Sequence, residues 1–109
     1  MIAEKQLGQR RDNDTSTHTV YTVPTGKSVR ITQITLCNTS GSAAYLRVFK
    51  STGTTYNRNT AIIYSKLIPA NDTLELSGNR YLEAAGTVGC QQGTANAISI
   101  TVEGLEITL

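Results

Sequence analysis

The sequence has few of the residues that build chemical sites. Its 109 residues include no tryptophan, one phenylalanine, one histidine and two cysteines. A single His18, with no Cys-x-x-Cys or His-x-His spacing, excludes the common zinc patterns. No Gly-x-Ser-x-Gly segment and no phosphate-binding glycine loop is present, which excludes those nucleophile and nucleotide motifs. We therefore expect a non-enzymatic protein with no catalytic residue, no metal and no cofactor.

Long apolar runs and helical periodicity are also missing. No stretch approaches 18 consecutive apolar residues, so we expect no membrane-spanning helix. Residues 1–5 are not followed by the apolar core of a signal peptide, so we expect synthesis in a cytoplasm and no membrane partner. No helical pattern of 10–15 residues separates the apolar segments, which excludes a parallel α/β fold.

Short alternating segments separated by turn residues fill the chain instead. This spacing predicts an all-β fold, a single antiparallel β-sandwich of the jelly-roll kind with seven to nine strands. In the turn Pro24-Thr25-Gly26, proline sets one φ and glycine is free to take a positive one. The predicted strands span residues 2–7, 18–23, 28–38, 45–50, 61–68, 73–76, 80–84, 86–91 and 98–109, with 61–68 apolar on both faces and well buried.

The alternation of apolar residues changes phase twice. Val29 and Ile31 give way to Ile34 and Leu36 near Gln33, which predicts a β-bulge. At Gly104 the sequence also resets its phase, so that Leu105, Ile107 and Leu109 are expected to continue the apolar face of the last strand. The polar segment that follows Leu7 has no apolar period. We expect residues 1–17 to form an N-terminal arm that docks on a partner and residues 18–109 to form the sandwich.

The charges are divided along the chain. Residues 1–14 sum to zero, residues 15–71 carry +6 with no acidic residue, and residues 72–109 carry −4. The two halves could attract each other within one molecule or between neighbouring molecules. We expect interface residues in the arm and in the two halves: Lys5, Arg10, Arg11, Arg30, Arg47, Lys50, Glu103 and Glu106.

Three further interpretations concern thiols, nucleic acid and sugars. Cys37 and Cys90 could pair, but nothing points to an oxidising compartment, and free thiols on strands are favoured. The basic residues are scattered and no RNA-binding motif is present, so no nucleic-acid partner is expected. A sugar-binding module stays open, because exposed and clustered Tyr56, Tyr64 and Tyr81 would form a platform for it.

Three segments, "VYTVPTGKSVRITQITLCNTSGSAAYLRVF", "LIPANDTLELSGNRYLEAAGTVG" and "ANAISITVEGLEI", carry a resemblance. In their order of turns and strands they resemble small β-sandwich virion proteins of tailed bacteriophages, although Glu83–Gly86 contains one additional alanine. The resemblance covers about residues 19–107 and implies a structural virion protein made in the host bacterial cytoplasm. It implies no catalytic residues.

The resemblance and the charges together predict a bacteriophage virion structural protein. The expected form is a homo-oligomer, a trimer or a larger ring, that serves as a head decoration (cement) or fibre-type protein anchored on the coat. Its other partners would be virion proteins such as the major coat or tail proteins. The alternatives are a tail adaptor or tail-tip ring protein and, from another class, a carbohydrate-binding module that contacts host surface glycans.

Overall fold

The computed structural model describes residues 1–108 as eight strands whose pairings are all antiparallel. No helix in the part of the chain that the structure describes is long and apolar enough to cross a membrane. The strands are β1 (Ile2–Arg11), β2 (His18–Thr22), β3 (Lys27–Asn38), β4 (Ala44–Ser51), β5 (Ala61–Ile68), β6 (Thr73–Leu82), β7 (Thr87–Gln92) and β8 (Ile98–Thr108).

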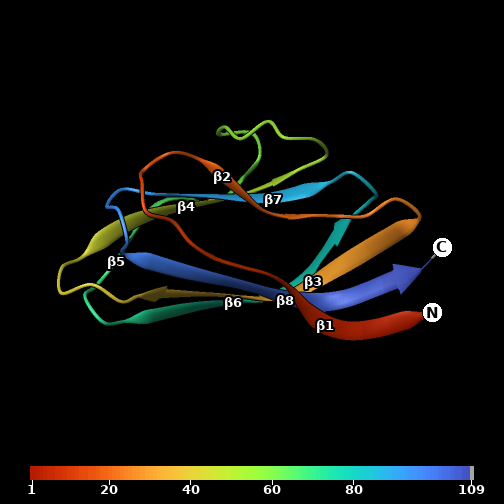
Figure 1. The fold of residues 1–109 in the computed structure, drawn as a ribbon, viewed down its shortest axis with the longest axis horizontal. Helices are drawn as coiled ribbons and strands as arrows, with labels where there is room; N and C mark the ends of the chain where they lie inside the picture. Colours follow the sequence, from red (N-terminus) through yellow and green to blue (C-terminus); the bar gives the residue numbers. More distant parts are fainter. Residues whose placement is uncertain (109) are drawn as a thin grey trace.

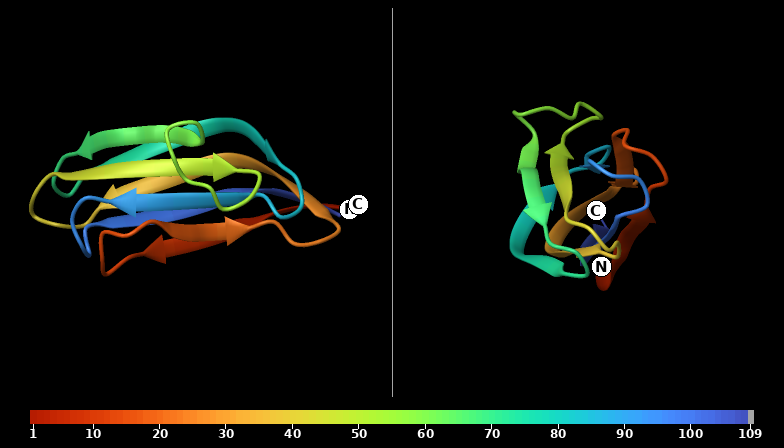
Figure 2. Two further views of the ribbon diagram at one scale, coloured as in Figure 1. Left: turned by 90° about the horizontal axis from the view of Figure 1, so that it is seen from above. Right: turned by 90° about the vertical axis from the view of Figure 1, so that its left-hand side faces the viewer.

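The strands form two four-stranded sheets that lie face to face (Figure 1; Figure 2). One sheet has the order β1-β8-β3-β6, and the other has the order β2-β7-β4-β5. Apart from β4 and β5, the neighbours within each sheet are not consecutive in the chain, as in a jelly roll of eight strands. The predicted jelly-roll sandwich is therefore confirmed. Gly26 takes the expected positive φ, +79°, in the turn between β2 and β3.

The core lies between the two sheets and follows the alternation of the central strands. From Ile98 to Glu106 every second residue of β8 is buried, because successive side chains of a strand point to opposite faces. β3 and β4 alternate in the same way except at the start of β3 and where their pairing is irregular. The fully buried core side chains are mostly branched aliphatic residues, which suit a pleated and close-packed interior. They include Val29, Ile31, Ile34, Leu36, Leu46, Val48, Val88, Ile100 and Val102.

The phase change near Gln33 is a β-bulge, as predicted. The pairing of β3 with both neighbours shifts between Ile31 and Gln33, and the pairing of β1 with β8 shifts between Gln6 and Gly8 at the same level. The second predicted phase change is wrong, because β8 stays regular and its neighbours bulge instead. The buried positions of β8 therefore continue through Gly104 to Glu106, while Leu105 and Ile107 are only half-buried.

Two predicted strand features are corrected. β5 lies at a sheet edge, so it is half-exposed rather than well buried on both faces. The segments 73–76 and 80–84 are one strand, β6, because Gly78 (φ +150°) lies within an irregularity in its pairing and does not form a turn. The burial of β5 and the continuity of β6 thus depend on which strands pair with them and not on the local sequence.

The beginning of the predicted arm is an ordered strand. β1 continues past Leu7 to Arg11 and pairs with β8 along its length, so residues 2–11 form one edge of a sheet. Gly8 allows β1 to approach β2, since a Cβ at this position would lie 2.7 Å from the carbonyl oxygen of Val20. Docking of residues 1–17 on a partner stays a prediction.

Candidate functional site

The outer face of the β2-β7-β4-β5 sheet is covered at one end by the chain's own β4–β5 loop (Figure 1). Tyr56 of this loop lies against Gly89, where an added Cβ would come within 2.6 Å of the tyrosine ring. Its ring also packs beside Phe49 at 5.6 Å between centroids. The hydroxyl of Tyr56 donates to Thr87 and bonds to Thr19 on β2, which fixes the loop. The strands at this end are therefore covered by the chain itself.

The rest of this outer face is open. Tyr45 is 57% exposed and its partner across the strands, Leu67, is 47% exposed. Beside them is a hollow of about 400 Å³. Its wall includes Tyr45, Arg47, Gln91 and Ser65. We call Tyr45, Arg47, Arg58, Tyr64 and Leu67 the tyrosine–arginine face.

Two arginines converge on one tyrosine of this face. The guanidinium carbon of Arg47 lies 4.2 Å from the centroid of the Tyr64 ring, and that of Arg58 lies 5.6 Å from it. Arg47 is oriented further by its Nε–H, which donates to the hydroxyl of Ser65 at 2.9 Å. A hydrogen bond from Arg58, with the nearby charges of both arginines, lowers the pKa of Tyr64. Within residues 1–108 neither arginine forms an ion pair.

A second hollow, of about 510 Å³, lies on the outer face of the opposite sheet. Its wall is formed at the level where β1 and β3 bulge on either side of β8. Glu103 and Leu105 point outward around it, since Gly104 between them is buried, and its other charged residues are Glu4 and Lys5. The charge of Lys5 is paired with Glu106, so the unpaired charges here are acidic. We call this surface the acidic hollow. Glu4 and Glu103 form no ion pair within the described residues.

Glu106 points inward at the end of the sandwich, unlike its neighbours Glu103 and Leu105. Its carboxylate accepts from Lys27 Nζ at 2.8 Å and from Lys5 Nζ at 3.3 Å, and the residue is 8% exposed. These two lysines hold the pKa of Glu106 below its usual value, Lys27 contributing more. The acidic and basic halves thus meet here within one molecule.

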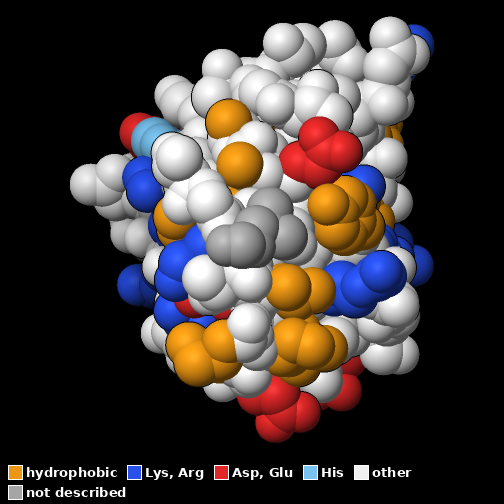
Figure 3. Space-filling view, turned by 90° about the vertical axis from the view of Figure 1, so that its right-hand side faces the viewer, with side chains coloured by type: hydrophobic (Ala, Val, Ile, Leu, Met, Phe, Trp, Pro, Cys, Tyr) orange, Lys and Arg blue, Asp and Glu red, His pale blue; other side chains and the backbone are white. Residues whose placement is uncertain are grey.

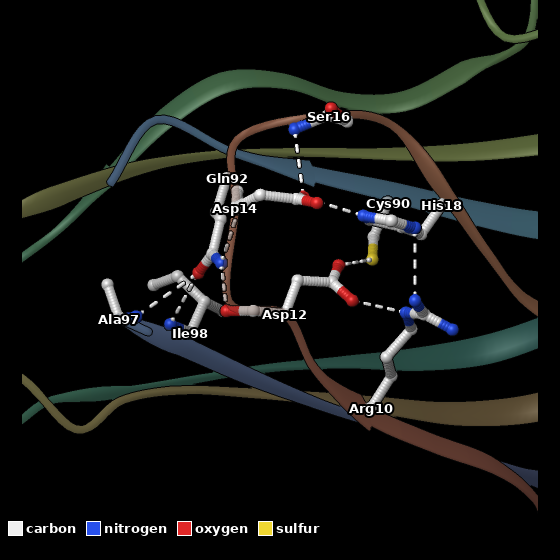
Figure 4. Close-up of polar contacts among 9 residues, drawn as sticks. All are labelled: Arg10, Asp12, Asp14, Ser16, His18, Cys90, Gln92, Ala97 and Ile98. Atoms are coloured by element: carbon white, nitrogen blue, oxygen red, sulfur yellow. Dashed lines mark hydrogen bonds and ion pairs between the residues drawn. The ribbon is translucent and has the colours of Figure 1, made fainter. Parts of the chain in front are cut away.

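A polar network joins the β1–β2 connection to β7 (Figure 4). Arg10 pairs with the buried carboxylate of Asp12 and donates to His18 Nδ1 at 3.0 Å. The other ring nitrogen of His18 bonds to Asp14 at 2.6 Å, and this bond lowers the pKa of Asp14. Cys90 Sγ lies 3.6 Å from Asp12. Within residues 1–108 no group of three or more His, Cys, Asp or Glu side chains could hold a metal ion.

Within this network Gln92 uses the full hydrogen-bonding capacity of its buried side-chain amide. Nε2 donates to the carbonyls of Asp12 (2.6 Å) and Asp14 (3.0 Å). Oε1 accepts from the backbone N–H groups of Ala97 (3.2 Å) and Ile98 (2.9 Å). Gln92 therefore ties the β1–β2 connection to the β7–β8 turn. The sequence gives no signal that separates this glutamine from Gln91 beside it.

The structure distributes the predicted interface residues over several surfaces. Arg47 lies on the tyrosine–arginine face and Glu103 at the acidic hollow, which are on opposite sheets. Arg30 lies on the same sheet as Glu103, 5.6 Å from the ring of Tyr81. Four more predicted residues make polar contacts within the molecule. Lys5 and Glu106 pair with each other, Arg10 pairs with Asp12, and Arg11 donates to the carbonyl of Asn96. Lys50 is half-buried on β4.

Other residues of the candidate surfaces are not those predicted. Tyr45 was not named for any surface, and Leu67 lies in the segment 61–68, which was predicted to be well buried. The three tyrosines named for a sugar platform do not meet: Tyr56 packs under its loop, and Tyr64 and Tyr81 are on different sheets. Cys37 and Cys90 are both free, as favoured.

The end of the sandwich that carries both termini has hydrophobic side chains gathered beside lysine and arginine (Figure 3). Met1 is 86% exposed and Ile2 is 65% exposed at this end. The carbonyl of Met1 nevertheless accepts from the N–H of Thr108 at 2.8 Å, so the backbone here is held in the sheet. An ordered and exposed apolar end is typical of surfaces that contact other proteins.

Comparison with known proteins identifies the fold. No protein-family model matches the sequence, and a search of curated protein sequences finds no relative. The structure is similar to one of Bacillus endospore appendages, described as a family of disulfide-linked pili, with a TM-score of 0.63, 18% identity and coverage of 99% of this chain and 88% of that one.

Two viral structures are also similar. One is of the infectious bursal disease virus Gx strain (TM-score 0.58, 12% identity, 99% of this chain and 33% of that chain). The other is the acidic stable capsid of Helicobacter pylori bacteriophage KHP30 (TM-score 0.52, 12% identity, 98% of this chain and 93% of that chain). At such identities the likeness concerns the fold: this chain has a β-sandwich fold that also occurs in virus, phage and pilus structures.

Proposed function

We propose that this protein is a non-enzymatic structural subunit of a bacteriophage virion and that it works as a homo-oligomer of the decoration or fibre type. The observation that carries the proposal is the pair of outer faces of opposite charge. Arg47 and Arg58 lie on one, beside exposed apolar side chains. Glu4 and Glu103 lie on the other, beside the half-buried Leu105. Tyrosine, arginine and leucine beside a polar rim are the composition of a protein–protein contact.

The N-terminal end is the proposed anchor on the coat. Met1 and Ile2 extend from an ordered strand, so an apolar contact there needs little ordering of the chain. The expected effect of Ile2→Asp is lower occupancy on the particle with an unchanged fold, because Ile2 is 65% exposed. Deleting residues 1–12 would be a poor test, since it would remove β1 from its sheet.

The experiment that tests the proposal is quantitative mass spectrometry of phage particles. The particles are purified on a gradient from a bacterial host that produces the protein. A structural subunit is expected at many copies per particle, and immunogold labelling then separates head from tail. The native mass of the purified protein is measured in parallel at low salt and at ~0.5 M salt, where screening is short-ranged. Absence from purified particles would refute the virion role.

A tail adaptor or tail-tip ring is the alternative within this class, and labelling at the tail would favour it. From another class, a sugar-binding module has one supporting observation. The hollow beside Tyr45 combines an aromatic wall with Arg47, Gln91 and Ser65, which could bind sugar hydroxyls or a carboxylate. Binding of host glycans that is lost in Tyr45→Ala and kept in Tyr81→Ala would establish this activity.

A further inference from the structure

The two outer faces of the sandwich carry unpaired charges of opposite sign. Arg47 and Arg58 both approach Tyr64, and among residues 1–108 no carboxylate lies within ion-pair distance of either. On the other face Glu4 and Glu103 are equally without an ion-pair partner in the described part of the chain. Each guanidinium makes a favourable contact with the ring, and together the two concentrate positive charge on this face, which an acidic partner would complement.

Both faces place apolar side chains beside a depression. On the tyrosine–arginine face Tyr45 and Leu67 are 57% and 47% exposed, and Tyr45 forms part of the wall of the hollow of about 400 Å³. The acidic hollow, of about 510 Å³, is lined by Glu4, Glu103 and Leu105, and also by Lys5, whose charge is paired with Glu106. An exposed aromatic side chain with an arginine beside it is complementary to a depression whose unpaired charges are acidic.

We propose that a second copy of this chain is the partner of each face. The tyrosine–arginine face of one molecule binds the acidic hollow of the next, with Arg47 and Arg58 opposite Glu4 and Glu103. This inference rests on the proposed homo-oligomeric function and names the surfaces that make the contact. Among the residues first expected at an interface, it keeps Arg47 and Glu103 and removes Glu106, whose charge is already paired within the molecule.

The position of the faces determines the kind of assembly. They are the two outer surfaces of a two-layer sandwich and point in opposite directions (Figure 2). A heterologous contact between opposite surfaces repeats along a line and does not close into a small ring. Since packed sheets lie ~10 Å apart, each molecule adds ~20 Å to such a stack. The assembly is therefore a short column or fibre, rather than the trimer or ring expected from the sequence.

The test is a charge reversal on each face of the full-length protein. Light scattering over a range of concentrations measures association, and negative-stain electron microscopy shows its form. Arg47→Glu and Glu103→Lys are each expected to weaken association by about tenfold or more, because each places like charges opposite one another. Glu83→Lys is the matched control: it changes the net charge as Glu103→Lys does, but lies in an exposed turn at the end of the sandwich and is expected to associate as wild type.

Mixing the two variants distinguishes this contact from others. Each variant keeps one intact face, and the altered residues Glu at 47 and Lys at 103 are again of opposite sign. An equimolar mixture, and the double variant alone, are therefore expected to regain association to within a few-fold of wild type. Circular dichroism on each variant verifies that the fold is retained.

Three results would overturn the stack. They are a wild-type monomer at ~0.5 mM and low salt, closed rings of fixed size, and unchanged association in both single variants. Closed rings, or single variants that associate as wild type does, would refute this contact. The virion role would then be tested separately by mass spectrometry of the particles. If the protein forms columns but is absent from purified particles, the contact is supported and the virion role is refuted.

Discussion

Replacement of Gln92 by leucine should remove the strongest polar tie between the β1–β2 connection and the β7–β8 turn. The change keeps the approximate volume of the side chain but removes four hydrogen bonds to backbone groups. Asp14 is exposed, so its carbonyl can turn to water. Ala97 and Ile98 are 0% and 4% exposed, so their backbone N–H groups would lose their partner where water has little access. The buried carbonyl of Asp12 would keep its hydrogen bond from the N–H of Asn96 at 2.9 Å.

The expected cost follows from the two buried N–H groups that lose their partner. Each unpaired group costs ~1–3 kcal/mol, so Gln92→Leu should lower the free energy of unfolding by about 2–6 kcal/mol. That is a large part of the ~5–15 kcal/mol typical of a domain, and corresponds to a fall of roughly 10–25 °C in Tm. Urea denaturation with calorimetry measures both quantities.

The neighbouring Gln91 provides the control. Gln91→Leu removes a donor to the carbonyl of Thr15 and a long contact with Arg47, both at the surface. Its expected cost is below ~1 kcal/mol. If Gln92→Leu proved no more costly than Gln91→Leu, the buried amide would not hold these segments together, and the reasoning would be refuted.

Three other properties can be measured on the same protein. Gly104→Ala should lower the free energy of unfolding by about 3 kcal/mol or prevent folding, because the added Cβ would lie 2.1 Å from the carbonyl oxygen of Arg30. At Gly41 an added Cβ would have nothing within 4 Å, so Gly41→Ala should change the free energy of unfolding by less than ~0.5 kcal/mol. Urea titrations measure both. Burial, followed by the charge of Asp12, raises the pKa of Cys90 to about 12, so its thiol should react with a disulfide reagent only after unfolding; rapid labelling in the native state would contradict this. Tyr64 has a lowered pKa, so ultraviolet titration should show one tyrosine ionising at lower pH than the others, and this component should be missing in Tyr64→Phe; equal curves below the midpoint of the other tyrosines would contradict the arginine contacts.

Several elements could be predicted because their local sequence is unambiguous. β5 has the predicted bounds, and the expected strands 18–23 and 28–38 agree with β2 and β3 to within one residue at each end. The bulge near Gln33 was visible because a change of phase in buried residues requires an additional residue in the strand. Alternation and turn residues are local signals, and they suffice for an antiparallel sandwich.

Other features depend on which strands become neighbours. The apolar sequence of β5 predicted burial, but its place at the sheet edge leaves Tyr64 and Leu67 exposed. The apolar Leu105 and Ile107 predicted a new phase in β8, but the compensating bulges occur in β1 and β3, and Glu106 points inward. No local pattern contains the order of strands in a sheet.

By itself, the sequence determined the class of this protein: an antiparallel β-sandwich with a basic and an acidic half. Its periodicity, turns and charges are properties of segments of a few residues, and these are retained wherever the segments lie. Only the tertiary structure decided that Arg47 and Glu103 lie on opposite outer faces while Glu106 is paired inside. The reason is that pairing between strands distant in sequence selects the edges and the outer face of each sheet, and so decides which charges remain free for a partner.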